Sequence, residues 1–202
     1  MASLQARKQE LVRNEIYKAA IELFLVEGFE ATTIDDIARA AGVSRRSMFR
    51  YFRSKNDLLA HSVMSYRDAL VAAIHGCAPL SSPLSLLRQA VASAALYVGS
   101  HPLSRKVIRI ASDSIGARQA HQSRMPELAD SLSEAFALKL APAKRSEDVP
   151  HMLAELTILI MNVAIRSWYL ERYSDLPAAA EKTLGDLAGF FRPTAGFDPQ
   201  VM

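Results

Sequence analysis

Apolar residues near the N-terminus recur every three or four positions, which is the spacing of a helix with one buried face. Thr33 followed by Asp36 has the pattern of a capping box, so a helix is predicted to begin at Thr33. Gly42 follows the last periodic residue, where helix ends favour a left-handed backbone. Between these limits, one apolar stripe is made up of Ile34, Ile37, Ala38 and Ala41.

A second short helix is predicted directly after the turn at Gly42, Val43 and Ser44, because the serine can cap it. Met48 and Phe52 are four residues apart, so both point to the same side, toward the core. The residues left facing outward are Arg45, Arg46, Ser47, Phe49 and Arg50. Two short helices joined by a tight turn form a helix-turn-helix, which places its second helix in the major groove of DNA.

Helical spacing continues along the chain, and the few Gly and Pro residues, 8 and 9 of 202, lie between the periodic segments. The pattern predicts an all-α protein of about nine helices, with a DNA-binding domain over residues 1–54 and a larger helical domain over residues 55–202. A break near Pro126 is an alternative for one helix, and the tail is expected to fray. Helices are predicted after residue 54 over residues 55–75, 82–99, 102–114, 118–140, 148–173 and 177–192.

The positive charge of the chain lies in its first quarter. Residues 1–55 hold 10 Lys and Arg against 7 Asp and Glu, whereas the remaining residues hold 14 of each kind. A basic stretch attached to one helix is typical of phosphate binding. A solvated basic face is the alternative for a charge run alone, but the turn and the caps favour DNA binding.

The single cysteine, Cys77, excludes an intramolecular disulfide framework and a cysteine-based zinc site, and it suits a reducing cytoplasm. The N-terminus lacks the apolar run of a signal peptide. We expect no apolar stretch of the about 18 residues that a membrane span needs. The best candidate, from Leu153 to Ile165, carries Glu155 and Asn162. These features predict a cytoplasmic protein with no membrane partner.

A nearly continuous set of positions between residues 13 and 59 matches a known pattern. It consists of Leu23, Phe24, Gly28 and Phe29, then residues 31–34, Ile37, Ala38, residues 40–44 and residues 48–55. With these residues, the segment resembles the DNA-binding domain of the TetR family of bacterial transcriptional regulators. The remaining three quarters of the chain match that family only in length and helical character. The resemblance implies that residues 55–202 form a ligand-binding and dimerisation domain.

The resemblance also implies DNA contacts position by position. Thr33 would offer its hydroxyl to a phosphate at a helix N-terminus, and Tyr51 and Lys55 match positions that contact the DNA backbone. Arg45, Arg46 and Ser47 would face base edges, where arginine can hydrogen-bond guanine at two atoms. The complete predicted DNA-binding set is Thr33, Ser44, Arg45, Arg46, Ser47, Phe49, Arg50, Tyr51 and Lys55.

Two positions depart from the pattern of the family. Arg46 stands where many members have glycine, so a longer side chain would enter the groove. Phe49 stands where tyrosine is usual, so it keeps a ring for a thymine methyl group but has no hydroxyl for a phosphate. Inward packing is the alternative for both Phe49 and Tyr51.

The segment over residues 148–173 is apolar nearly all round, so it must be covered on more than one side. The segment over residues 177–192 has large apolar residues interspersed with small ones that permit close approach. We predict, as the resemblance also implies, that both helices pair with their symmetry mates in a four-helix dimer interface. A monomeric bundle is the alternative. The predicted interface residues are Leu184, Leu187, Ala188 and Phe191.

A ligand pocket among the middle helices is implied by the resemblance alone. Methionine and aromatic side chains are adaptable pocket walls, although ordinary core positions are the alternative for each of them. Arg109 could meet an anionic ligand or face solvent. The candidate lining residues are Tyr97, Arg109, Met125, Phe136, Met161, Trp168 and Tyr169.

The resemblance implies a homodimeric repressor of a palindromic operator in double-stranded DNA, released by a small-molecule effector. A ligand-independent or activating regulator is one alternative, and a sequence-independent architectural DNA binder is another. An all-α enzyme is disfavoured, because we find no nucleophile motif and no Gly-rich phosphate loop. His151 and Glu155 share a helix face but have no third metal ligand in view. We therefore expect no catalytic residue, no metal and no cofactor.

Overall fold

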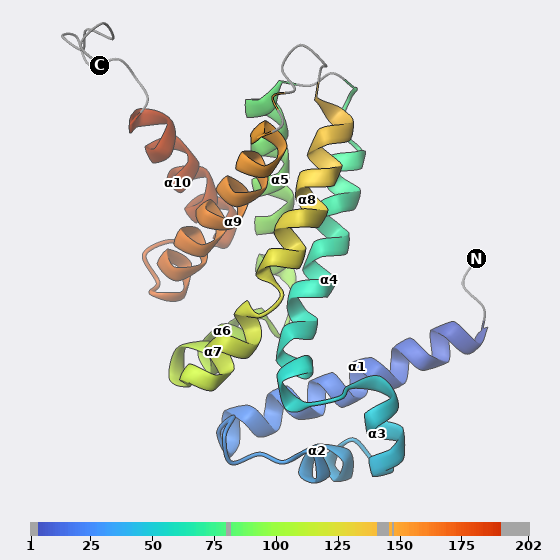
Figure 1. The fold of residues 1–202 in the computed structure, drawn as a ribbon. Coiled ribbons are helices and arrows are strands. Elements are labelled where there is room, and N and C mark those ends of the chain that lie inside the picture. The colour runs from blue at the N-terminus through green and yellow to red at the C-terminus, as the bar shows by residue number, and fades with distance from the viewer. Residues whose placement is uncertain (1–3, 80–81, 141–145, 147, 191–202) are drawn as a thin grey trace, which may run out of the picture. The chain divides into compact units, whose positions relative to one another are not determined.

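The structure, a computed structural model, describes residues 4–79, 82–140, 146 and 148–190. These residues form ten helices, so the predicted all-α fold is confirmed (Figure 1). The helices are α1 Leu4–Val26, α2 Ile34–Ala40, α3 Arg45–Tyr51, α4 Lys55–His75, α5 Pro83–Ser100, α6 Ser104–Asp113, α7 Ile115–Gln122, α8 Met125–Lys139, α9 Asp148–Tyr169 and α10 Leu176–Phe190.

One predicted helix is divided in two. The segment expected as a single helix over residues 118–140 is α7 followed by α8, with a break at Ser123 and Arg124. The Ser123 hydroxyl donates to the carbonyl of Ala120 at 2.7 Å, which satisfies an acceptor at the end of α7. Pro126 then lies in the first turn of α8, where its missing N–H has no helical partner to lose.

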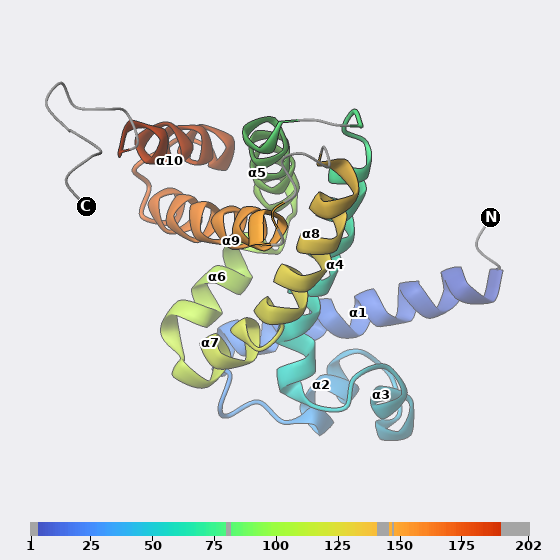
Figure 2. The same ribbon diagram turned by 45° about the horizontal axis from the view of Figure 1, so that its top comes forward.

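The chain divides into two compact units, and the first comprises residues 1–71 and 100–132. Its core joins α1 to α2, α3 and the start of α4, and α6 and α7 add apolar side chains to the same core. This unit is larger than the domain predicted over residues 1–54, because α6 packs against α1 (Figures 1 and 2). The buried residues that α6 and α7 contribute are Val107, Ile110, Ala117 and Ala120.

The second unit comprises residues 72–99 and 133–202 and contains α5, α9 and α10. Figures 1 and 2 show α9 and α10 side by side. Gly99 on α5 lies close to α10, since a Cβ added there would be 3.4 Å from Leu176 Cβ. The buried side of α9 consists of Pro150, Leu153, Ala154, Thr157, Ile160, Met161, Ala164 and Trp168.

Helix α9 is long and apolar enough to cross a membrane by length and composition, which corrects the expectation that no segment would be. Only 39% of its most apolar 18-residue window is buried within this chain. Its exposed apolar residues are Met152, Leu159 and Val163, and Leu170 follows its last turn. The described chain therefore leaves one apolar face of α9 uncovered.

Candidate nucleic-acid interface

The predicted capping box at the start of α2 is present. The backbone N–H of Asp36 donates to Thr33 Oγ1 at 3.2 Å, and the backbone N–H of Thr33 donates to Asp36 Oδ2 at 3.2 Å. The Thr33 hydroxyl also donates to the Asp36 carboxylate, and this bond is the main reason why the pKa of Asp36 is lowered. In this structure, the hydroxyl predicted to contact a phosphate is therefore already bound within the chain.

The turn between α2 and α3 has the geometry that the sequence predicts. Gly42 has a φ of +65°, which an L side chain adopts only with strain. Ser44 Oγ caps α3 by accepting from the Ser47 N–H at 3.0 Å. Met48 and Phe52 are buried, so the opposite side of α3 faces solvent. The helix is thus fixed from inside the unit, and its polar face is left free for a partner.

Three arginines of α3 are exposed. Arg45 Nη1 donates to Asp35 Oδ2 at 2.8 Å, and its guanidinium lies 5.7 Å from the centre of the Phe49 ring. Arg50 donates to the Tyr51 hydroxyl at 3.1 Å and lies over that ring. The Phe49 side chain is 44% exposed, so it does not pack inward. Tyr51 is half-buried, between the two alternatives considered for it.

Arg46 differs from its neighbours on α3. Its side chain has no hydrogen-bond or ion-pair partner among the described residues. Arg46 therefore offers all five N–H groups of its guanidinium to a partner outside the chain.

Lys55, predicted to contact the DNA backbone, forms hydrogen bonds within the chain in this structure. Its ammonium donates to the carbonyls of Phe29 at 2.7 Å, Glu30 at 2.8 Å and Thr32 at 3.4 Å. It also lies 4.8 Å from the centre of the Phe29 ring. An ammonium has three N–H donors, so these carbonyls can use all of them. Lys55 thereby fixes the loop between α1 and α2 to the start of α4.

The same loop is joined to α7, which sequence reasoning missed. Ser114, the N-cap of α7, donates its hydroxyl to Glu30 Oε1 at 2.5 Å, and this bond is the main reason why the pKa of Glu30 is lowered. A Cβ added to Gly116 would lie 2.9 Å from the same oxygen, so the missing side chain leaves room for the carboxylate. Lys106 on α6 forms an ion pair with Glu22 on α1. Helices α6 and α7 therefore pack against the helix-turn-helix unit through polar as well as apolar side chains.

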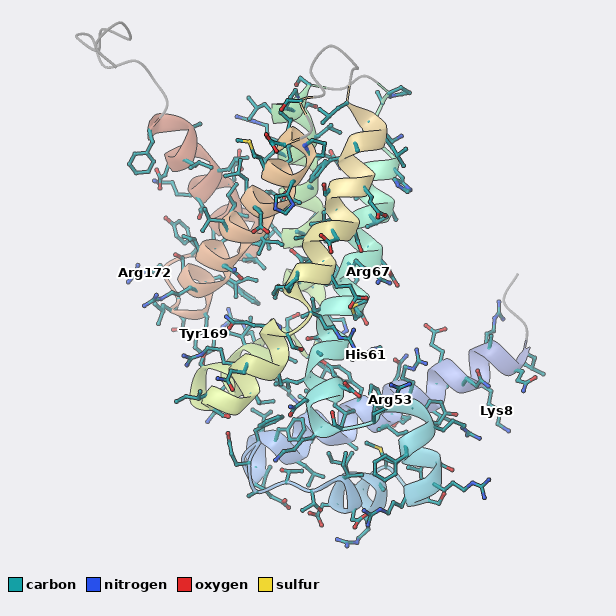
Figure 3. All side chains as sticks on the ribbon, in the orientation of Figure 1. Lys8, Arg53, His61, Arg67, Tyr169 and Arg172 are labelled. Carbon is teal, nitrogen blue, oxygen red and sulfur yellow. The ribbon has the colours of Figure 1, made fainter. Side chains whose placement is uncertain are left out.

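His61 on α4 lies against the helix-turn-helix (Figure 3). Its ring centre is 5.4 Å from that of Tyr17 on α1 and 5.4 Å from that of Phe52, the C-cap of α3, both in edge-on arrangements. Burial, and secondarily the charge of Arg13, lowers the pKa of His61. The neutral imidazole is the form that this packing favours.

The predicted pocket residues fall in both units. Phe136, Met161 and Trp168 are buried and Tyr97 and Tyr169 half-buried within the second unit. In the first unit, Met125 is half-buried, and Arg109 is exposed and pairs with Asp113 at 3.6 Å, so the solvent-facing alternative fits Arg109. The pocket stays a prediction.

Three of the predicted interface residues lie on α10. Leu184 is buried, Leu187 is half-buried and Ala188 is exposed, whereas Phe191 lies outside the described residues. No group of three His, Cys, Asp or Glu side chains in the described part of the chain could hold a metal ion. His151 and Glu155 form only an exposed pair, with 3.9 Å between Nε2 and Oε1.

Comparison with known proteins adds to this geometry. A family profile described as bacterial regulatory proteins of the tetR family matches residues 16–61. The HTH-type transcriptional regulator TcmR of Streptomyces glaucescens is 26% identical over 182 residues, which cover 87% of this chain and 80% of TcmR.

Solved structures are similar over most of the chain. NalD, the secondary repressor of the MexAB-OprM multidrug efflux pump in Pseudomonas aeruginosa, superposes with a TM-score of 0.64 at 23% identity, over 90% of this chain and 96% of NalD. A structure of AibR in complex with isovaleryl coenzyme A and operator DNA superposes with a TM-score of 0.53 at 18% identity, over 87% of this chain and 97% of AibR. These likenesses extend well beyond residues 16–61.

Proposed function

Because this chain belongs to the tetR family of bacterial regulatory proteins, we propose that it is a homodimeric repressor that binds a palindromic operator and is released by a small molecule. It is a DNA-binding transcriptional regulator and not an enzyme. The observation that carries the proposal is the exposed basic face of α3, which a capped turn and two buried side chains hold in place. Its site of action is the bacterial cytoplasm.

DNA binding by α3 rests on the side chains of its exposed face. Arg45 and Arg46 lie in its first turn, the part of a recognition helix that meets base edges. Arg50 adds positive charge one turn later, and Phe49 presents an aromatic ring to the same side. Arginine suits guanine, whereas the ring suits a thymine methyl group.

Dimer formation explains the uncovered apolar face of α9. Met152, Leu159 and Val163 are each about half exposed, although they lie on a helix whose other side is buried. On α10, Gly185, Ala188 and Gly189 are exposed, so the backbone of a second copy could approach closely. Pairing of both helices across a two-fold axis would remove this apolar surface from water. The same axis would present two α3 helices to a palindrome.

Release by a ligand fits the course of α4. Residues 55–71 of this single helix belong to the first unit, and residues 72–75 belong to the second. A ligand in the second unit would change the separation of the two recognition helices through α4. Such a ligand must bind the DNA-incompetent state more tightly, or it shifts no population. NalD is a repressor, and the AibR complex contains a small molecule as well as operator DNA, so this fold can hold a ligand site and a DNA site in one chain.

Selection of binding sites from a random DNA pool tests the proposal. We expect an inverted repeat and a steep salt dependence of binding, because the contacts to phosphates release counterions. Arg46→Ala is expected to relax the preference at one base position of each half-site, at a cost of about 1–3 kcal/mol. Enrichment of no motif by the unmodified protein would overturn the proposed function. Equal weakening on all sequences by Arg46→Ala would overturn the base contact alone.

A further inference from the structure

We propose that Asp35 is a positioning residue for base recognition, which holds Arg45 for a base edge instead of a phosphate. The inference rests on the proposed DNA-binding function. It concerns an acidic side chain that the family resemblance assigns to no DNA contact.

Two adjacent acids open α2, and only one of them caps the helix. Asp36 accepts the Thr33 N–H and hydroxyl and pairs with Arg39 at 3.0 Å. The carboxylate of Asp35 instead bonds across the turn to Arg45 on α3, ten residues further along the chain. Asp35 is therefore not part of the capping box that Asp36 forms. The structural role of Asp35 is its bond to Arg45.

Arg45 is held from two sides while it stays exposed. Asp35 Oδ2 accepts from Nη1 at 2.8 Å, and the Phe49 ring lies one turn further along α3, 5.7 Å from the guanidinium. The Arg45 side chain is nevertheless 67% exposed. A guanidinium has five N–H groups, so the Asp35 bond leaves others free to donate to a base. An arginine ordered in this way loses less rotamer freedom when it binds.

The charge of Asp35 acts in the same direction. A carboxylate next to a guanidinium repels phosphates, so it weakens the competing contact between Arg45 and the DNA backbone. The neighbouring Arg46 has no such partner among the described residues. Asp35 therefore lowers sequence-independent attraction and raises discrimination between bases.

Asp35→Asn tests this role, because asparagine keeps the shape of the side chain and removes its charge. A bidentate arginine contact discriminates between bases by about 5- to 150-fold. We expect Asp35→Asn to reduce the discrimination at one base position of the selected site by about 3- to 10-fold. Binding to unrelated DNA is expected to tighten. The slope of log affinity against log salt concentration is expected to steepen by about the amount that one phosphate contact contributes, because Arg45 becomes free to reach a phosphate.

Glu15→Gln is the matched control, because it removes one negative charge from an exposed position on α1. It should leave the preference for each base unchanged. Asp35→Glu should restore part of the discrimination that Asp35→Asn loses. In an Arg45→Ala background, Asp35→Asn should have no further effect on base preference, because the residue acts through Arg45.

The outcomes separate this inference from the proposed function. Failure of the unmodified protein to select any DNA motif would overturn both. A selected motif with an unchanged base preference in Asp35→Asn would overturn only the role of Asp35. Uniform weakening on every sequence, together with a lower melting temperature, would show that Asp35 merely joins α2 to α3.

Discussion

At the scale of the residue, His61 makes the stability of the helix-turn-helix depend on pH. Its pKa in the folded chain is lowered, chiefly by burial between Tyr17 and Phe52. The unfolded chain therefore binds a proton more readily, from about pH 6.5 downward. The contribution of His61 to stability is complete above that pH and is lost as the pH falls toward the lowered pKa. Acid should thus weaken the packing of α3 and α4.

The comparison that checks this expectation is His61→Phe, which keeps an aromatic ring and removes the titration. The free energy of unfolding, measured by urea denaturation from pH 7.5 to pH 5, should fall less steeply in this variant. Part of the pH dependence should remain, because burial also lowers the pKa values of His101 and His121. Identical slopes for both proteins would show that His61 carries none of the effect.

A substitution of Lys55 can distinguish a structural role of this residue from a role in DNA contact. Its ammonium donates to the carbonyls of the loop between α1 and α2. Lys55→Met is therefore expected to lower the free energy of unfolding by about 1.5–3 kcal/mol, as for hydrogen bonds to charged groups. The salt dependence of DNA binding should not change. Lys8→Met, at an exposed position on α1, is the control and should leave stability within about 0.5 kcal/mol (Figure 3). A shallower salt dependence with unchanged stability would restore the DNA contact that the family resemblance implies.

At the scale of the element, a strained residue lies in the turn directly after α9. Glu171 has a φ of +57°, and the Arg172 N–H donates to the carbonyl of Ser167 at 3.1 Å, as in a Schellman motif. Glycine suits this position because it has no Cβ. Glu171→Gly should stabilise the protein by about 1 kcal/mol relative to Glu171→Ala. The difference in melting temperature is expected to be about 2–4 °C by calorimetry. Equal melting temperatures for Glu171→Gly and Glu171→Ala would show that the backbone at this position is not strained.

Local signals account for the parts of the fold that the sequence predicts. The caps at Thr33 and Ser44 involve residues three positions apart, so a short window of sequence contains both partners. The contact between Glu30 and Ser114 spans 84 residues, and no periodicity indicates it. The same holds for Lys55, whose carbonyl partners are 23 to 26 residues away. Element positions follow from local chemistry, whereas these partners follow only from the packing of α4, α6 and α7.

At the scale of the whole molecule, the oligomeric state depends on what covers the exposed apolar face of α9. A helix that is apolar on both sides has to be covered on both. The described chain buries one side of α9 and leaves Leu159 and Val163 about half exposed. Membrane insertion is the other way to cover an apolar helix, but α10 already packs against α9. In the proposed dimer, a second copy of the chain would cover the remaining face and would also supply the second α3 helix that a palindrome requires.

Leu159→Glu tests this arrangement. In a two-fold interface each substitution occurs twice, so two unpaired carboxylates would be buried on association. We expect the dissociation constant of the dimer to rise by about 100-fold or more, which corresponds to about 2.7 kcal/mol. Leu138→Glu is the matched control, because it introduces the same change at an exposed leucine of α8. Sedimentation equilibrium at micromolar concentration should find a monomer for Leu159→Glu and a dimer for Leu138→Glu. A dimer in both variants would place the interface elsewhere, whereas a monomeric parent protein would exclude a dimer interface.

Since half-site separation depends on the dimer, Leu159→Glu should also lose the preference for an inverted repeat over a single half-site.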